Sequence, residues 1–376
     1  MKINIIGDIA GSSGYAIHTR ELAKALSKIA DVKLNCNIPP GFEKELTDRE
    51  LENIKKQDSQ DRVNLIITNP SVWKLHLNKK INIVYLIFEG SHIPDWIINN
   101  CLDKRISKIL VASTHTRDAV VRTLHERYSI QNPFSEGTQI PRSSSVLNNI
   151  IIPKLRVINH GVCLDTFYKK DMPKNKFTFL CLKGWRNNED RGGNQYAVKS
   201  FLEEFNSKDN VRMIIKINPA YGIPDVNKLT NELNIQNKDL PELIFDGASY
   251  PYNQLVNIYN QADVFVMPTR AEAYGIPVNE ASACGIPTIC TNFGGQIDFV
   301  DNEIGWLVDY DLTEVKHEIL YEGISWATPK IDDLRSKMRY AYENKEEVKI
   351  KGEKAREKVK GWTWDITAKR IIDVLD

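Results

Sequence analysis

Several features that define other classes of protein are missing from this sequence. No window approaches the ~18 uninterrupted apolar residues of a membrane-spanning helix, so we do not expect one. The opening Met1–Gly7 has one lysine and a very short apolar run, which indicates a first buried strand rather than a signal peptide. None of the six cysteines forms a Cys-x-x-Cys pair. These absences predict a cytoplasmic protein with reduced core cysteines.

Dinucleotide and metal signatures are also absent. No Gly-x-Gly-x-x-Gly fingerprint follows the first strand, which argues against a dinucleotide-dependent dehydrogenase. No His/Cys cluster offers a transition-metal site. Asp309-Tyr310-Asp311 spells the DxD pattern that binds divalent metals in other transferases. We expect this segment to start a helix that its aspartates cap, and we therefore predict no metal and no cofactor.

What is present suits a two-domain globular protein. The chain has 376 residues, of which 42% are apolar and 26% charged. Residues 1–175 hold 25 Lys+Arg against 18 Asp+Glu, a net charge of +7, whereas residues 176–376 hold 25 against 31, a net charge of −6. The basic first half would favour an anionic acceptor or weak peripheral association with the inner face of a membrane. Chance, or complementarity between two docked halves, explains the asymmetry equally well.

Short β-branched runs alternate with amphipathic stretches through the first half. This order predicts strands and helices in turn, and hence a parallel doubly wound sheet. The strands are expected at 3–7, 63–68, 81–88, 109–112 and 155–158. The helices are expected at 15–29, 94–102 and 114–124, the last capped by Ser113 or Thr114. Residues 127–152 break the pattern and are interpreted as a long surface loop.

A second α/β series follows a polar, lysine-rich linker at 165–176. Strands are expected at 177–182, 211–217, 243–245, 264–267 and 288–290. Helices are expected at 196–205, 226–233, 252–261 and 277–284, with a helical tail from about Leu312. The fold class is therefore α/β, with a first domain at 1–165 and a second at 176–360. A last amphipathic helix at about 365–376 should pack back on the first domain.

The stretch PTRAEAYGIPVNEASACGIPTICTNFGG is the most informative part of the sequence. It follows an apolar strand, and open α/β sheets bind ligands at the carboxyl ends of their strands. Pro277 suits a first helical turn and Gly285 the position after a helix. The start of this helix would attract a diphosphate. Glu272 could reach a sugar hydroxyl, and Glu280, in the first turn, a vicinal diol; capping would explain both glutamates equally well.

This stretch resembles the E-x7-E motif of the family-four retaining glycosyltransferases, which have the GT-B fold of two Rossmann-like domains facing each other across a cleft. The spacing, the internal Gly-Ile-Pro and the following Gly-Ile-Pro strand all agree with that motif. The resemblance implies that Glu272 approaches hydroxyls of the transferred sugar and that Glu280 binds the ribose. It also implies that donor sugar and phosphates touch the backbone of Ala273, Tyr274, Gly275 and Ile276.

Other segments are similar to the same family. Gly11-Ser12-Ser13-Gly14 resembles its glycine loop, with Ser13 in place of a glycine, and Gly14 would bring its N–H to the β-phosphate. Asp246-Gly247 matches the segment that lines the base pocket. Trp362-x-Trp364 resembles the tail that crosses back to the first domain, where we expect the indoles to pack rather than bind ligand.

A charged loop near the start of the second domain resembles the one that supplies cations to the donor diphosphate. Lys183-Gly184-Trp185-Arg186 and Arg191-Gly192-Gly193 carry this likeness, although Arg191 stands where the family has lysine. Fixed cations stabilise the negative charge that develops on the leaving phosphate. Arg186 and Arg191 are the favoured residues and Lys183 the third; a solvated charged loop is the alternative.

The first-domain site is the least defined by sequence. In the segment after the strand at 81–88, Glu89 is the candidate for holding an acceptor or donor-sugar hydroxyl, and His92 is the runner-up. His92 would otherwise cap the following helix. His160 lies in a segment similar to the family's domain connection, where Cys163 replaces an aspartate. We expect His160 to act at a hinge and not in catalysis.

Taken with the resemblance, these residues predict a metal-independent hexosyltransferase that uses a nucleotide-diphosphate sugar and retains the anomeric configuration. No pair of carboxylates suits a double-displacement glycosidase, so we expect the leaving diphosphate itself to accept the acceptor's proton. The acceptor would be a glycan, a lipid-linked sugar or another hydroxyl, and no nucleic acid is expected. A nucleotide-sugar epimerase and a catalytically silent nucleotide-sugar-binding subunit stay open as alternatives.

Overall fold

In the computed structural model the chain divides into two compact units. The structure describes residues 1–11, 13–127, 149–182, 190–217, 224–316, 321 and 323–375. Unit 1 consists of Met1–Gly161, Lys316–Ile324 and Thr363–Asp376. Unit 2 consists of Val162–Val315 and Ser325–Trp362. The loop expected at 127–152 lies largely outside the described residues.

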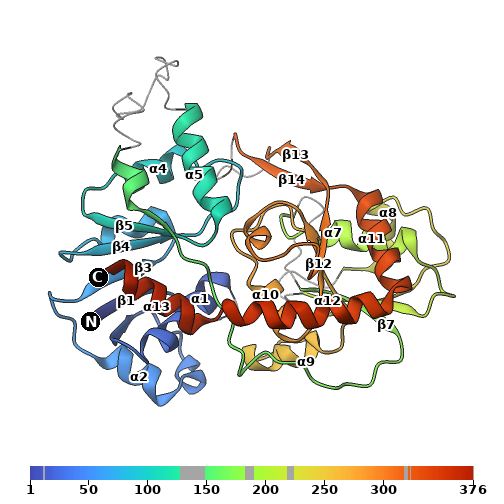
Figure 1. The fold of residues 1–376 in the computed structure, drawn as a ribbon, viewed down its shortest axis with the longest axis horizontal. Helices are drawn as coiled ribbons and strands as arrows, with labels where there is room; N and C mark the ends of the chain where they lie inside the picture. Colours follow the sequence, from blue (N-terminus) through green and yellow to red (C-terminus); the bar gives the residue numbers. More distant parts are fainter. Residues whose placement is uncertain are drawn as a thin grey trace. The chain divides into compact units, whose positions relative to one another are not determined.

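Unit 1 contains, within the described residues, a six-stranded parallel sheet in the order β2-β1-β3-β4-β5-β6 (Figure 1). Its strands are β1 (Lys2–Gly7), β2 (Asp31–Asn35), β3 (Val63–Ile67), β4 (Asn82–Leu86), β5 (Ile106–Val111) and β6 (Leu155–Val157). Its helices are α1 (Gly14–Leu26), α2 (Asp48–Lys55), α3 (Trp73–His76), α4 (Asp95–Cys101), α5 (Thr114–Arg127) and α13 (Trp364–Leu375). The expected strand–helix alternation is confirmed, since each predicted element of this half has its counterpart here.

Both faces of the unit 1 sheet are covered. A buried core joins side chains of β1, β3, β4 and β5 to those of α3, α4 and α5. The helix expected at the end of the chain is α13, which lies against α1 (Figure 1). Ser113 caps α5, since its Oγ lies 3.2 Å from the Thr116 N–H. Strand β4 is buried at every residue, as expected of a strand in a parallel sheet covered on both sides.

Unit 2 holds a second six-stranded parallel sheet among its described residues, in the order β12-β11-β10-β7-β8-β9. Its strands are β7 (Phe177–Leu182), β8 (Val211–Lys216), β9 (Glu242–Asp246), β10 (Val264–Met267), β11 (Thr288–Thr291) and β12 (Gly305–Val308). Its helices are α7 (Asn194–Glu204), α8 (Val226–Glu232), α9 (Leu255–Tyr259), α10 (Ile276–Ala283), α11 (Ile331–Glu343) and α12 (Lys345–Lys358). The two parallel α/β units confirm the expected fold class.

The division into units differs from the sequence boundaries in two places. Residues 165–176, read as a linker, belong to unit 2, because Phe167 is fully buried and the Lys170 N–H donates to Asn260 Oδ1 at 2.7 Å. Residues 316–324 belong to unit 1, although the chain on either side of them is in unit 2. The chain therefore passes between the units more often than a single linker would require.

The expectation of a helical tail from about Leu312 is wrong. Residues Tyr310–Glu314 form β13, which pairs antiparallel with β14 (Ser325–Pro329), and the α-helix that follows β14 begins at Ile331. Threonines on each strand pair across this hairpin, and such cross-strand pairs stabilise a sheet. The Asp309–Asp311 segment therefore does not start a helix. Asp311 lies 3.8 Å from the Lys330 ammonium.

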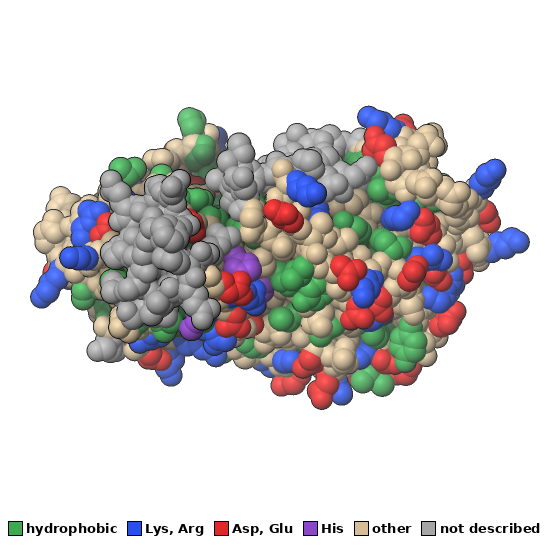
Figure 2. All heavy atoms as spheres, turned by 90° about the horizontal axis from the view of Figure 1, so that it is seen from above, with side chains coloured by type: hydrophobic (Ala, Val, Ile, Leu, Met, Phe, Trp, Pro, Cys, Tyr) green, Lys and Arg blue, Asp and Glu red, His purple; other side chains and the backbone are tan. Residues whose placement is uncertain are grey.

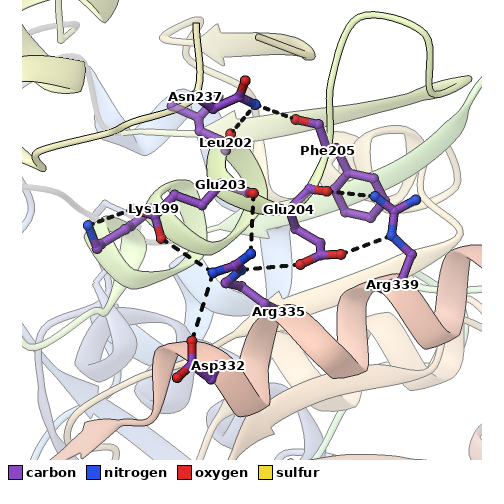
Figure 3. Close-up of polar contacts among 9 residues, drawn as sticks. All are labelled: Lys199, Leu202, Glu203, Glu204, Phe205, Asn237, Asp332, Arg335 and Arg339. Atoms are coloured by element: carbon purple, nitrogen blue, oxygen red, sulfur yellow. Dashed lines mark hydrogen bonds and ion pairs between the residues drawn. The ribbon is translucent and has the colours of Figure 1, made fainter. Parts of the chain in front are cut away.

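Polar contacts fix α7 against α11 (Figure 3). Arg335 and Arg339, from α11, bind the carboxylate of Glu204 at 3.2 and 2.9 Å. The last carbonyls of α7 also accept hydrogen bonds, among them Glu204 O from Arg339 at 2.6 Å and Phe205 O from Asn237 at 2.8 Å. Cations and donors at a helix C-terminus satisfy carbonyls that have no partner within the helix. This network anchors the helix that follows the Arg191 loop.

Replacing Arg339 by alanine should lower the free energy of unfolding by about 1–3 kcal/mol. The change removes ion pairs to Glu204 and Asp209 and a guanidinium that lies 4.3 Å from the Phe205 ring centroid. Urea unfolding of unit 2 would measure the loss. Lys349→Ala is the control, because its ion pair with Glu346 is exposed. Equal stability of the two variants would contradict the anchoring role.

The described surface shows mixed charge. Figure 2 shows acidic and basic side chains interspersed over unit 2 on the face displayed. Among the described residues, none of the helices has both the length and the apolar character that crossing a bilayer demands. All six cysteines are free; four are buried, and Cys36 and Cys163 are half-buried. The expected reduced core cysteines are confirmed for those four.

Candidate active site

The candidate donor site lies along one edge of the unit 2 sheet. Because the strands are parallel, the residues that end them share this edge: Leu182 of β7 is opposite Lys216 of β8, which is opposite Asp246 of β9. Strand β10 ends at Met267 and leads into the Glu272 loop. Ligands of open α/β sheets bind at this carboxyl edge.

The loop that carries Glu272 is held by the turn after β11. Glu272 is half-buried, and its backbone carbonyl accepts a hydrogen bond from the Gly295 N–H at 2.7 Å. Tyr274 is buried, its hydroxyl accepts from Asn279 Nδ2 at 2.8 Å, and its ring packs on Phe299. These contacts give the loop a fixed path, which any precise contact to a sugar requires.

Helix α10 begins as the sequence predicts. Gly275 has φ +99°, a conformation that side chains other than glycine rarely adopt, and it leads directly into the first helical residue, Ile276. Pro277 follows in the first turn, and Gly285 has the positive φ of a helix end. Glu280 is the fifth residue of α10, so it lies one residue beyond the first turn in which it was expected. It lies further from the positive helix end than expected.

Two tyrosines hold the carboxylate of Glu280. The Tyr252 hydroxyl donates to Oε1 and the Tyr259 hydroxyl to Oε2, each at 2.6 Å. Glu280 and Tyr259 are 2% and 0% exposed, so water does not compete for the bond between them. Burial, and then the charge of Glu280, raise the pKa of Tyr259 well above its usual value, which keeps this hydroxyl a donor.

The Arg191 loop and the Glu272 loop are bonded to each other. The Arg191 carbonyl accepts hydrogen bonds from the Arg270 N–H at 2.9 Å and from the Thr269 hydroxyl at 3.0 Å. The Arg191 side chain is exposed, and Gly193 caps α7 two residues later. The structure thus joins two loops whose cation and carboxylate are 81 residues apart in the chain. The other proposed cations, Lys183 and Arg186, lie outside the described residues.

The predicted base-pocket segment follows β9. The Asp246 carboxylate accepts from the Ala248 N–H at 2.9 Å, and Gly247 is half-buried beside it. The Lys216 ammonium donates to the Asp246 carbonyl at 3.3 Å and lies 5.5 Å from the Tyr250 ring centroid. Partial burial lowers the pKa of Lys216, and Asp246 acts in the opposite direction. Lys216 thus adds a cation to this edge that the sequence analysis did not name.

In unit 1 the glycine loop and the Glu89 segment are neighbours. Gly14 is the first residue of α1, which Ser13 caps by accepting from the Ala16 N–H at 3.1 Å. No described atom lies within 4 Å of the place where a Cβ on Gly14 would be, so a phosphate has room to approach. The Tyr15 hydroxyl lies 3.5 Å from the Ile87 carbonyl, close to the end of β4.

Glu89 and His92 occupy different surroundings. Glu89 is 6% exposed, and its Oε1 accepts from the Tyr321 hydroxyl at 2.6 Å. His92 is half-buried, and its ring lies 2.8 Å from the carboxylate of Glu126 on α5. The helix after His92 has Pro94 at its cap position, so His92 does not cap it. Of the two candidates, Glu89 has the enclosed setting that suits precise orientation of a bound hydroxyl.

His160 belongs to a buried aromatic cluster inside unit 1. Its ring centroid is 4.1 Å from that of His18 and 5.7 Å from that of Trp364, while Tyr85 packs edge-on against His18 at 4.4 Å. The expectation that Trp364 packs rather than binds ligand is confirmed, since it is 3% exposed. Burial, and then the nearby His160, lower the pKa of His18 well below its usual value. His18 is therefore neutral in the folded protein at neutral pH.

Acidification should weaken unit 1. His18 takes up a proton below pH ~6.5 once unfolded but only at lower pH when folded, so stability is present above that pH and falls as pH decreases. Hydrogen exchange of the α13 amides should be faster at pH 5.5 than at 7.5, after correction for intrinsic rates. His18→Phe should reduce this pH dependence, whereas His125→Gln, at an exposed histidine, should keep it. Identical pH dependence in His18→Phe would refute this role.

The residues that sequence analysis missed are mostly partners of the predicted ones. They are Tyr252 and Tyr259 on Glu280, Tyr321 on Glu89, and Lys216 beside Asp246. Only Lys216 left a local signal, as a lysine that directly ends the apolar strand VRMIIK. No group of three or more His, Cys, Asp or Glu side chains suited to a metal ion occurs in the described part of the chain.

Comparison with known proteins supports a glycosyltransferase. Residues 221–358 match the family model described as glycosyl transferases group 1, a stretch that includes Glu272 and Glu280. The chain is similar to a D-inositol 3-phosphate glycosyltransferase of Corynebacterium urealyticum, with 30% identity over 125 residues, 33% of this chain and 25% of that protein. It is also similar to Protein CapJ of Staphylococcus aureus, with 25% identity over 44% of this chain and 41% of CapJ. The matches thus span less than half of these relatives.

Solved structures extend the likeness in fold to the whole chain. HepE of Anabaena in complex with UDP-glucose superposes with a TM-score of 0.68 and 13% identity, over 100% of this chain and 99% of HepE. A glycosyltransferase from Rickettsia africae gives a TM-score of 0.66 and 15% identity, over 99% and 97% of the two chains. At such identities the likeness concerns the fold. The family match and the two parallel α/β units together support a glycosyltransferase family, with the GT-B fold, for this chain.

Proposed function

We propose that this protein is a retaining glycosyltransferase that moves a hexose-type sugar from a nucleotide-diphosphate donor to a hydroxyl acceptor without a metal ion. The observation that carries this proposal is the bonded pair of loops in unit 2. The Arg191 carbonyl accepts from the Arg270 N–H at 2.9 Å, which places a guanidinium on the loop beside the one that carries Glu272. A cation and a carboxylate on adjoining loops at a carboxyl sheet edge suit a sugar diphosphate.

The donor would bind by its phosphates at two kinds of group. The exposed Arg191 supplies charge, and the start of α10 supplies backbone N–H groups and the positive end of the helix dipole. Glu272, on the loop between them, would accept hydrogen bonds from the transferred sugar. Glu280 would bind the ribose. Asp246 and Gly247 would border the base.

Transfer would proceed on one face of the sugar. The bond between the anomeric carbon and the phosphate oxygen breaks, and the leaving diphosphate takes the proton of the acceptor hydroxyl. The oxygen of that hydroxyl forms the new bond on the same face, so configuration is retained. Arg191 stabilises the charge that develops on the diphosphate. Glu89 of unit 1 would hold the acceptor or a hydroxyl of the donor sugar.

The known proteins support more than one donor base. Complexes of HepE contain UDP and glucose, and TarM was solved with UDP, whereas a relative from Corynebacterium glutamicum, 33% identical over 96 residues, is a GDP-mannose-dependent mannosyltransferase. We therefore propose a uridine or guanosine diphosphate sugar. The acceptor would be a carbohydrate or a lipid-linked glycan.

A two-stage experiment tests this function. Thermal unfolding with UDP, GDP, ADP and their sugars should show stabilisation by one nucleotide series, since a ligand of the folded state raises the unfolding temperature. The matching nucleotide sugar is then incubated with and without glycan acceptors. Acceptor-dependent release of the nucleotide, with a product of unchanged anomeric configuration, supports the proposal. Conversion of the donor to its epimer, or binding without any turnover, would overturn it.

A further inference from the structure

A tyrosine far away in the sequence holds the Glu89 carboxylate. The Tyr321 hydroxyl donates to Glu89 Oε1 at 2.6 Å, and Glu89 is 6% exposed. The Tyr321 ring stacks on Phe88 with centroids 5.6 Å apart, so the phenol is held by ring packing as well as by its hydroxyl hydrogen bond. A short hydrogen bond to an ionised group, shielded from water, orients that group strongly.

Neighbouring contacts fix the same segment of unit 1. The Ile324 N–H donates to the Tyr321 carbonyl at 3.0 Å, and the Ile324 side chain is fully buried in the core that contains Phe88. Gly90 makes this packing possible, because a Cβ there would collide with Ile324 Cγ2. On the other side, the Glu89 carbonyl lies 3.1 Å from His115 Nε2, in the first turn of α5. Glu89 is thus enclosed by its own strand end, α5, Tyr321 and Ile324.

The segment that carries Tyr321 continues along the chain into β14 of unit 2. Strand β14 begins at Ser325, and within it the Ala327 N–H donates to the Arg270 carbonyl at 2.8 Å. The Trp326 ring lies 5.5 Å from the Arg270 guanidinium. Arg270 precedes Glu272 by two residues. Three residues of chain therefore lead from Ile324, packed in unit 1, to Ala327, bonded to the loop that carries Glu272.

We propose that Tyr321 is a positioning residue for the Glu89 carboxylate. The inference rests on the proposed function, in which Glu89 receives a substrate hydroxyl. The phenol gives Glu89 one orientation, with Oε1 as the hydrogen-bond acceptor. Tyr321 itself touches no reacting atom.

Tyr321→Phe tests the inference, because it keeps the ring on Phe88 and removes only the hydroxyl. We expect kcat for transfer to fall by about ten- to a hundredfold. The pH profile of kcat should change, while nucleotide binding in the thermal-unfolding assay stays unchanged. In a Glu89→Gln background, Tyr321→Phe should lower kcat less than threefold. The matched control is Tyr340→Phe, which removes an exposed phenol–carboxylate bond of the same 2.6 Å length, to Glu347.

The four proteins that combine Tyr321→Phe and Glu89→Gln also form a stability cycle that needs no substrate. Urea unfolding should show that Tyr321→Phe loses at least half of its effect once Glu89 is glutamine. Wild-type kcat and pH profile in an active Tyr321→Phe enzyme would overturn the positioning role. A wild-type protein that consumes no donor but shows the coupling would count against the proposed function and leave the Tyr321–Glu89 pair intact. Additive effects of the two substitutions on both kcat and stability would contradict the inference.

Discussion

Arg191→Ala should reduce kcat for sugar transfer by about 100- to 1000-fold while the protein stays folded. Removing one preorganised group that stabilises developing charge typically costs this much in rate. The Arg191 side chain is exposed, and the contacts that position its loop are made by its backbone carbonyl, which alanine retains. We therefore expect a change in unfolding free energy within about 0.5 kcal/mol. Steady-state kinetics and urea unfolding on the same preparation would measure both.

Separate measurement of kcat and KM tests the role of Arg191 more specifically. Charge on the leaving diphosphate is larger in the transition state than in the ground state, so kcat should fall more than KM rises. Arg191→Lys should keep part of the activity, because it keeps the charge but loses the bidentate geometry. Arg156→Ala, at an exposed arginine that donates to the backbone carbonyls of Pro153 and Leu155, is the control. An Arg191→Ala enzyme within threefold of wild type would remove the cation from the mechanism.

Sequence patterns foretold the elements that lie in the middle of each sheet. Strand β10 was placed without error at 264–267, and β7 at 177–182, because continuous apolar runs of this length are typical of strands buried on both faces. The edge strand β2 was missed, since DVKLN alternates and is only partly buried. The hairpin of β13 and β14 was missed because its sides are joined by residues 315–324, with no tight-turn signal.

The candidate site was predictable where chemistry is concentrated in one short segment. Glu272, Gly275, Pro277 and Glu280 lie within nine residues, and both their spacing and the end of the strand before them are visible in sequence. Their partners come from elsewhere: Tyr321 stands 232 residues from Glu89. A tyrosine that donates to a buried carboxylate has no local pattern, because only the tertiary fold brings the pair together. For this reason the charged groups are predictable from sequence, whereas the residues that hydrogen-bond to them are visible only in the structure.

Glu280→Ala should destabilise unit 2 by about 2–5 kcal/mol, since it leaves two tyrosine hydroxyls without their acceptor. Tyr259 is fully buried and cannot turn to water, whereas Tyr252 is half-buried and can. Glu280→Gln keeps the volume and one acceptor oxygen, so a smaller loss of about 1–3 kcal/mol is expected. Urea unfolding monitored in unit 2 would rank the three proteins.

The same variants separate support from ligand binding at Glu280. Tyr259→Phe removes one bond to the carboxylate but leaves Glu280 in place, so it should lower stability with little effect on nucleotide affinity. Glu280→Gln should weaken the nucleotide at least tenfold if the carboxylate accepts the ribose hydroxyls, since hydrogen bonds to charged groups are worth about 1.5–3 kcal/mol. Calorimetric titration below the unfolding temperature of each variant measures this. Unchanged nucleotide affinity in Glu280→Gln would mean that the carboxylate only holds α9 and α10 together. The ribose would then need another acceptor along the sheet edge.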